Sequence, residues 1–176
     1  MDERSEGTSD SGGLSHVRGA EDGSAEASMV DVGTKPVSER TALAAARLRF
    51  PAGLLQRIRE GAGPKGSLQA IQEVARTAGT LAAKRTGELI PMCHPLGLDH
   101  LDIRFDDPEP DVLEVRCRAA CRGRTGVEME ALVGASLAAL TLYDMTKALD
   151  PAIRIEDARL LEKTGGKRGL WRSEDG

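Results

Sequence analysis

Apolar positions recur along the chain with two different spacings, and their succession predicts a mixed α and β domain. Residues 68–85 carry apolar side chains at helical spacing and follow Ser67, a residue type typical of helix N-caps. Residues 127–149 predict a second long helix, and residues 51–60 a shorter one that begins with a proline. The positions of the second long helix that we expect to pack on a sheet are Leu132, Val133, Ser136, Leu137, Leu140 and Tyr143.

The strand signals lie between these helices. Residues 112–122 alternate apolar and polar side chains, which predicts a strand with one buried face, and residues 98–105 precede them across an acidic turn as the other half of an antiparallel hairpin. Residues 41–50 alternate less regularly, and we expect an edge strand there; residues 153–161 predict the last strand. This order predicts an α+β domain of the ferredoxin-like kind, an antiparallel sheet with helices packed on one face.

Composition sets the limits of the folded part. Residues 1–28 are rich in Ser, Gly, Glu and Asp and have few large apolar side chains, so we expect a disordered N-terminal tail. The folded domain is expected to span residues 29–170, and residues 171–176 to form a flexible C-terminal tail. A net charge of −4 and only one Trp, one Tyr and two Phe argue against nucleic-acid binding.

The same composition bears on the cellular compartment. No apolar run is long enough to cross a bilayer, and no hydrophobic leader opens the chain. The three cysteines, an odd number, suit reduced thiols. We therefore expect a cytoplasmic protein without membrane contact.

One segment, KRTGELIPMCHPL at residues 84–96, has an order that an ordinary helix or strand does not need. Pro91 and Pro95 force the residues before them towards extended geometry, so the chain must leave a helix and enter a loop that fixes Cys93 and His94 in place. The residues alone leave two interpretations open. The loop is either a binding site or a buried turn in which the cysteine serves as a small apolar side chain.

Cations recur on loops flanked by glycine and at helix ends. Any one of them is typical of a solvated surface, and a cation at position 84 also complements the helix dipole. Together they favour a small polyanionic ligand such as a nucleotide phosphate, although neither of the usual glycine-rich nucleotide motifs is present. These cations are Lys35, Arg40, Lys65, Lys84, Arg124, Lys163 and Lys167.

The sequence also contains a pair of residues that could transfer a proton. Asp144 and Lys147 lie one helical turn apart, so their side chains can meet, either as an ordinary surface ion pair or as a pair tuned for proton transfer. A metal site is not expected, because Cys93 and His94 are adjacent and cannot easily chelate one ion together. A serine hydrolase is also poorly supported, because no nucleophile elbow occurs.

Five segments in order, MVDVGTK, KRTGELIPMCHPL, TGVEMEAL, LTLYDMTKALD and LLEKTGGKRG, closely resemble those of the cyclic pyranopterin monophosphate synthases of molybdenum cofactor biosynthesis, the MoaC family. The resemblance covers residues 29–169. It implies a lyase that converts (8S)-3′,8-cyclo-7,8-dihydroguanosine 5′-triphosphate, made by a radical-SAM GTP 3′,8-cyclase, to cyclic pyranopterin monophosphate and diphosphate. It also implies a homohexamer built as a trimer of dimers. No cofactor is implied, and whether Mg²⁺ accompanies the triphosphate stays open.

Residue roles follow from the matching segments. The resemblance implies catalytic roles for Asp144, Lys147, Lys65 and Glu128. It implies substrate binding by Met92, Cys93, His94, Met129, Glu130, Lys84, Arg40, Lys163 and Lys167. The chain departs from the common pattern at Gly87, Ser67 and Arg124, all of which lie in or next to loops.

Two expectations complete the interpretation. Glu130 and Asp144 would lie about 21 Å apart along one helix at about 1.5 Å per residue, so we expect a site shared between chains. The alternative from another functional class is a non-catalytic module that senses a nucleotide. Such a module would bind the nucleotide, and no turnover would depend on Asp144 or Lys147.

Overall fold

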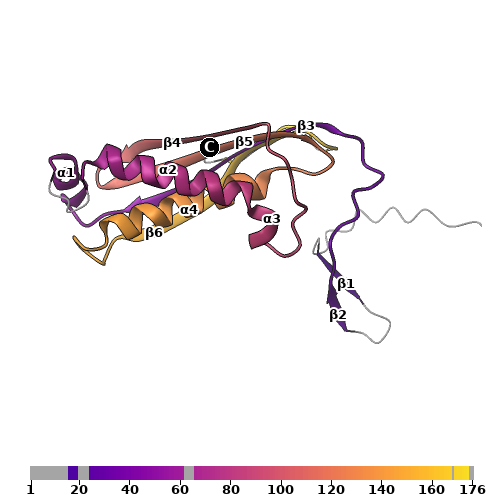
Figure 1. Ribbon diagram of the computed structural model, residues 1–176, viewed down its shortest axis with the longest axis horizontal. Helices are drawn as coiled ribbons and strands as arrows, with labels where there is room; N and C mark the ends of the chain where they lie inside the picture. The colour runs from indigo at the N-terminus through magenta and orange to yellow at the C-terminus, as the bar shows by residue number, and fades with distance from the viewer. Residues whose placement is uncertain (1–15, 20–23, 62–65, 168, 175–176) are drawn as a thin grey trace, which may run out of the picture.

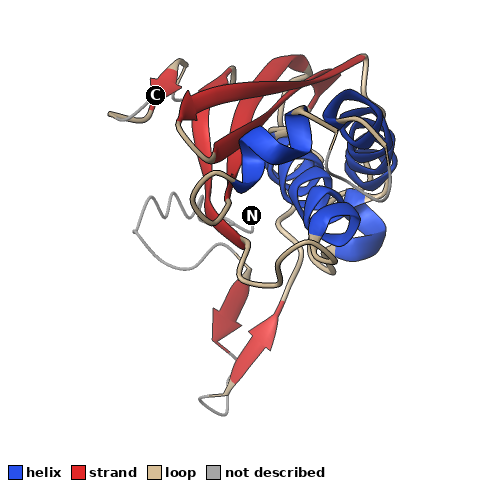
Figure 2. Cartoon of the chain, turned by 90° about the vertical axis from the view of Figure 1, so that its left-hand side faces the viewer, coloured by secondary structure: helices blue, strands red, loops and turns tan. Residues whose placement is uncertain are grey.

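The computed structural model describes residues 16–19, 24–61, 66–167 and 169–174. Its layers are an antiparallel sheet and a set of helices that lie along one face of that sheet (Figures 1 and 2). The elements in chain order are β1 (Val17–Gly19), β2 (Ala25–Ala27), β3 (Ser38–Arg49), α1 (Leu54–Arg59), α2 (Leu68–Lys84), α3 (Thr86–Leu89), β4 (His100–Glu109), β5 (Val112–Gly123), α4 (Glu128–Thr146), β6 (Arg154–Thr164) and β7 (Trp171–Arg172).

The predicted α+β class, with helices on one face of an antiparallel sheet, is confirmed, whereas the finer ferredoxin-like assignment stays a prediction. The strand order in the main sheet is β4-β5-β3-β6-β7, and every neighbouring pair is antiparallel. The β4–β5 hairpin forms as expected. Helix α2 begins after Ser67, whose hydroxyl accepts a hydrogen bond from the amide of Ala70, so the predicted cap is confirmed.

Strand β3 lies in the middle of the sheet, so the prediction of an edge strand was wrong. It pairs with β5 on one side and β6 on the other. Its alternation looked irregular because Ala45, on the face away from the helices, is as buried as Ala44 and Ala46 on the helix side. Ala45 lies between its cross-strand partners Arg116 and Arg159, whose side chains explain that burial. Because β3 is central and buried on both faces at this point, its sequence alternates only weakly between apolar and polar residues.

An ion-pair network explains why the helix-free face tolerates a buried acid. Glu114 is fully buried. Its carboxylate accepts hydrogen bonds from Arg47 at 2.7 Å, Arg116 at 2.7 Å and Arg159 at 3.3 Å. Burial alone would raise the pKa of Glu114, but the hydrogen bonds from Arg47 and Arg116 outweigh it and hold that pKa below its ordinary value. The network crosses β3, β5 and β6 and ties the central strands together.

The face of α4 that packs against the rest of the chain differs from the predicted one. Leu140, expected on the sheet, is 49% exposed, and five of the nine buried residues of the helix are alanine or glycine. The reason is a close crossing with α2: a Cβ added at Gly79 would lie 2.6 Å from the carbonyl oxygen of Gly134. Small residues are required at this crossing, and Leu140 is turned outward, although Leu142 on the same helix is fully buried. The predicted set Leu132, Ser136, Leu137 and Tyr143 is only half-buried, while Val133 is buried.

Both ends of the described chain contain secondary structure where we expected none. Strands β1 and β2 form an antiparallel pair that projects from the sheet and helices (Figures 1 and 2), although residues 1–28 were expected to be a disordered tail. Strand β7 pairs with the outer edge of β6 inside the tail expected at residues 171–176. Backbone pairing needs no apolar side chains, which is why composition did not indicate these strands. The rest of the predicted N-terminal tail, residues 1–15 and 20–23, lies outside the described residues.

Two further observations concern the core and the membrane. Cys117 and Cys121 are buried under the helices as expected, and burial raises the pKa of Cys117 to about 12. In the described part of the chain, none of the helices combines the length and the apolar character that a membrane span requires.

Candidate active site

Cations converge in a cleft of about 590 Å³, where the start of β3, the end of β6 and the first turn of α4 meet. The antiparallel register produces this convergence, because Thr41 of β3 pairs with Thr164 of β6, and Ser38 pairs with Gly123 at the end of β5. Five cationic residues line the described part of the cleft: Lys35, Arg40, Arg124, Lys163 and Lys167. We call it the cation cleft. It brings together the predicted residues Arg40, Lys163 and Lys167.

Glu128 is the one acid among the described residues that line the cation cleft. Its carboxylate accepts a hydrogen bond from Lys163 Nζ, at 2.8 Å from Oε1, and the two side chains are 28% and 33% exposed. The first turn of α4 favours a negative charge at this position because the positive end of the helix dipole lies there. The paired acid and lysine therefore give the cleft a group that can accept a proton next to a group that can hold an anion.

Glycines shape the wall of the cation cleft beside Arg40. Gly165 and Gly166 have φ values of 95° and 72°, which side chains larger than hydrogen rarely adopt. A Cβ at Gly165 would fall within 2.3 Å of the carbonyl oxygen of Glu39, and one at Gly166 within 2.2 Å of Arg40 Nη1. The glycines therefore let the loop that follows β6 lie directly against Arg40, between Lys163 and Lys167.

The Cys-His loop leaves α3 as the two prolines predicted. Ile90 is extended, with φ −112° and ψ 106°, and the loop folds back so closely that a Cβ at Gly87 would lie 3.1 Å from Pro95 Cα. This close approach explains why a glycine stands at position 87. Cys93 lines a hollow of about 240 Å³ together with Lys84 and Glu130, and we call this the Cys93 hollow.

His94 faces a different space from Cys93. It lines a hollow of about 490 Å³ together with Lys35, Glu128 and Lys163, all of which also line the cation cleft. Two consecutive residues of one loop thus line two different hollows. The first turn of α4 lies between these hollows, because Glu130 lines the one with Cys93 and Glu128 the one with His94. Of the other predicted residues, Met92 is half-buried and Met129 is 37% exposed.

Burial controls the protonation of the groups in the Cys93 hollow. Glu130 is only 4% exposed, and burial raises the pKa of its carboxyl, with a further contribution from the charge of Glu128. Burial also raises the pKa of the Cys93 thiol, and the charge of Glu130 adds to this effect. Cys93 is therefore a neutral thiol at neutral pH and is poorly suited to act as a nucleophile.

The structure does not bring all predicted residues together. Lys147 Nζ lies 2.7 Å from Asp144 Oδ1 near the C-terminal end of α4, away from the helix turn that carries Glu128 and Glu130. The Lys147 and Asp144 side chains are 52% and 57% exposed, and the hydrogen bond to Asp144 raises the pKa of Lys147. Lys65 lies outside the described residues. Within one chain, the pair is thus an exposed ion pair.

The site also includes residues to which the sequence analysis gave no role. Thr125 lines the cation cleft and the hollow that contains His94, and His16 lines that hollow from the segment before β1. The signal for Thr125 was present, because it lies in a turn between two glycines and next to Arg124. His16 had no such signal, because its contribution depends on how the N-terminal strands are placed.

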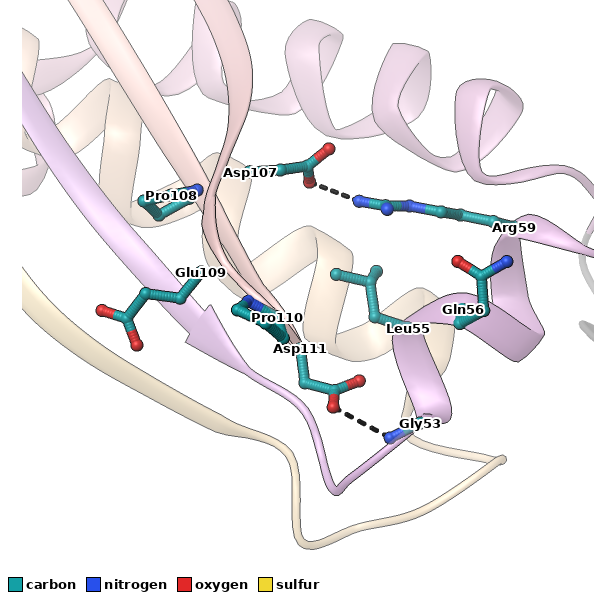
Figure 3. A pocket seen from close by; sticks show the side chains of 9 residues that line it. All are labelled: Gly53, Leu55, Gln56, Arg59, Asp107, Pro108, Glu109, Pro110 and Asp111. Carbon is teal, nitrogen blue, oxygen red and sulfur yellow. Dashed lines mark hydrogen bonds and ion pairs between the residues drawn. The ribbon is translucent and has the colours of Figure 1, made fainter.

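A further hollow of about 430 Å³ lies between α1 and the turn that joins β4 to β5 (Figure 3). Arg59 at its wall is bound to Asp107 at 2.5 Å, and the amide of Gly53 donates to Asp111 at 2.9 Å, as the dashed lines show. Glu109 makes the lining more acidic. A polyanion would be repelled here, and none of the predicted site residues contributes, so we assign the site to the cation cleft and its neighbouring hollows.

Comparison with known proteins finds relatives that match most of the chain. The family model of the MoaC family matches residues 29–166. The cyclic pyranopterin monophosphate synthase of Chloroflexus aggregans is 48% identical over 92% of this chain and 94% of its own length. The enzyme of the same name from Thermomicrobium roseum is 48% identical over 85% of this chain and 89% of its own length. Cyclic pyranopterin monophosphate synthase 1 of Mycobacterium tuberculosis is 47% identical over 90% of this chain and 89% of its own length.

Proposed function

Because the chain belongs to the MoaC family, we propose that it is a lyase of molybdenum cofactor biosynthesis. It converts (8S)-3′,8-cyclo-7,8-dihydroguanosine 5′-triphosphate to cyclic pyranopterin monophosphate and diphosphate. The observation that carries the proposal is the cation cleft, because a triphosphate is the kind of ligand that the five cations and the single acid among its described lining residues favour. The relatives carry the name of this enzyme over most of the length of both chains.

The division of the site into hollows suggests where each part of the substrate binds. Arg40, Lys163 and Lys167 hold the phosphates through charge-assisted hydrogen bonds. The fused rings lie towards the Cys93 hollow, which is smaller and has a buried wall, and towards His94. Glu128 stands between the two parts and can take up or release a proton while Lys163 neutralises its charge.

The proposal includes no resident cofactor. Turnover that persists in the presence of a strong chelator supports this. Turnover that the chelator abolishes and added Mg²⁺ restores would show that the metal accompanies the triphosphate.

We further propose that the active unit is a homohexamer built as a trimer of dimers and that its sites combine residues of two chains. Asp144 and Lys147 lie too far along α4 to reach a nucleotide held at the other end of the same helix. Leu140, one turn before Asp144, is 49% exposed although it is a large apolar residue. A second copy that covers Leu140 would also bring Asp144 into an interface, where it could complete the neighbouring site.

Subunit complementation tests the shared site. An inactive Asp144→Ala chain is mixed with an inactive His94→Ala chain, and subunits are allowed to exchange. Mixed dimers should regain one intact site and part of the activity if the two residues act from different chains. Activity that stays absent after exchange has been verified shows that they act from the same chain, and the shared-site proposal for this pair then fails.

The substrate chemistry also implies the supplier of the substrate. A cyclic purine nucleotide with a new carbon–carbon bond between ribose and base requires a radical cyclase, so the protein would act after a radical-SAM GTP 3′,8-cyclase. We propose the cytoplasm as the place of both steps. Diphosphate release by purified protein, with product of that cyclase as substrate, tests the function. Asp144→Asn should bind the nucleotide without releasing diphosphate. Binding by the unaltered chain without any release would instead favour a nucleotide-sensing module.

A further inference from the structure

Glu130 is a buried acid that faces a hollow. It lies in the first turn of α4, is 4% exposed, and lines the Cys93 hollow. Within the described residues, neither a hydrogen bond nor an ion pair joins its carboxyl to another side chain; a backbone hydrogen bond within Glu130 itself is the one favourable contact with the charge. A carboxylate in such a place lacks the partners that a buried charge normally requires.

Its neighbour Glu128 provides a comparison within the same helix turn. Glu128 is more exposed, and its carboxylate oxygen lies 2.8 Å from Lys163 Nζ. Glu130 has burial without pairing, and the negative charge of Glu128 two residues away opposes a second charge. The dipole of α4 favours the anion at both positions, and the backbone hydrogen bond at Glu130 adds to this effect, but burial outweighs both at Glu130.

The groups that face Glu130 come from every element around the hollow. Cys93 comes from the loop after α3 and Cys121 from β5, and both are neutral thiols because burial raises the pKa of each. Lys84 and Arg85 at the end of α2 and Glu88 in α3 line the hollow as well, and all three are exposed. The charged groups therefore lie towards solvent, and the groups that contribute to the buried part are neutral.

We propose that Glu130 acts as a neutral carboxylic acid and positions the fused rings of the substrate by donating its O–H to a ring acceptor. This inference rests on the proposed function, because it assumes that the ring system occupies the Cys93 hollow. A neutral acid presents one donor and one acceptor, whereas a carboxylate presents acceptors only. Glu130 would thus select a ring edge on which an acceptor atom lies beside an N–H, and would disfavour an edge with two donors.

Kinetics of two substitutions at this position test the proposal. Glu130→Gln keeps the shape, the neutrality and both hydrogen-bonding functions, so kcat/KM should stay within about threefold of the unaltered protein. Glu130→Ala removes the hydrogen bonds and should lower kcat/KM by about tenfold, mainly through KM. Glu73→Gln, an exposed acid of α2 that lines none of the hollows described above, is the control and should change neither constant. A glutamine variant as impaired as the alanine variant overturns the proposal, because it would show that the negative charge is needed.

The pH dependence gives a second criterion. KM of the unaltered protein should rise as the pH is raised through the elevated pKa of Glu130, because the O–H is lost, while KM of Glu130→Gln should stay level over the same range. The same rise in both proteins would assign the effect to another group and contradict the proposal.

Infrared spectroscopy separates this inference from the proposed function. The free protein at neutral pH should show the C=O stretch of a protonated carboxylic acid, and the difference spectrum against Glu130→Gln should assign it. This measurement needs no turnover, so it decides the state of Glu130 even if the unaltered protein fails to convert the cyclic nucleotide. A difference spectrum that contains only carboxylate bands overturns the proposal. Circular dichroism of both variants confirms that they are folded.

Discussion

Replacement of Lys163 by glutamine tests the cation cleft at its best-defined contact. Lys163 Nζ lies 2.8 Å from Glu128 Oε1, and at 33% exposure the ammonium is partly shielded from water. A hydrogen bond that involves a charged group contributes about 1.5–3 kcal/mol. If Lys163 makes one such bond to a phosphate, its loss weakens triphosphate binding by roughly 10- to 150-fold, since about 1.4 kcal/mol corresponds to a factor of ten.

Isothermal titration calorimetry with GTP, inorganic triphosphate and guanosine measures this change without turnover. Lys163→Gln should lose affinity for the two triphosphates and little for guanosine, which has no phosphate. Arg154→Gln is a suitable control, because Arg154 is an exposed cation at the opposite end of the same strand and does not line the cleft. Equal losses for GTP and guanosine, or an unchanged affinity for triphosphate, would refute the assignment of the cleft to phosphates.

The partner acid gives a prediction of opposite sign. Glu128→Gln removes the charge that competes with a phosphate for Lys163, so the affinity for inorganic triphosphate should rise even as turnover falls. A fall in triphosphate affinity would mean that Glu128 chiefly holds Lys163 in position.

Three further predictions concern stability and the chain ends. Glu114→Gln should lower the free energy of unfolding by about 2 kcal/mol at neutral pH. This loss should shrink as the pH falls below 4.5, because Glu114 of the unaltered protein is then protonated as the pH passes through its lowered pKa. Urea unfolding at several pH values measures the difference. Gly79→Ala should lower the melting temperature by forcing α2 and α4 apart, at a cost of about 1–3 kcal/mol, whereas Gly97→Ala, which meets open space, should not. Deletion of residues 1–15, which stops short of His16 and β1, should leave folding and turnover unchanged, and a large loss of activity in that truncation would contradict it.

Local signals predicted the elements that depend on neighbouring residues. The Ser67 cap of α2 and the β4–β5 hairpin are set by side chains within a few positions, so the sequence was sufficient. Strand β3 was misplaced at the sheet edge because its neighbours, β5 and β6, follow it by many residues. The packing face of α4 was predicted only in part, since Val133 is buried but Leu140 is exposed. The face depends on the crossing of Gly79 and Gly134, which only the folded chain brings together.

In the candidate site, too, the sequence predicted the local features but not the contacts between distant segments. Lys163 and Lys167 could be identified from their glycine-rich segment, but their meeting with Arg40 depends on the register of β3 with β6. The difference between Glu128, paired and half-buried, and Glu130, buried without a cation, could not be foreseen from two acids in one helix turn. The difference arises because Glu130 lies beside the Cys-His loop, whereas Glu128 lies beside β6, whose Lys163 donates a hydrogen bond to it.

The central claim is that this chain carries out the rearrangement itself. The most direct measurement incubates the purified protein with (8S)-3′,8-cyclo-7,8-dihydroguanosine 5′-triphosphate, oxidises the mixture and measures the fluorescent pterin that forms from cyclic pyranopterin monophosphate. The account predicts a pterin signal that grows with time, equals the diphosphate released, and is absent with Asp144→Asn. Unchanged substrate after prolonged incubation with folded, nucleotide-binding protein would contradict it.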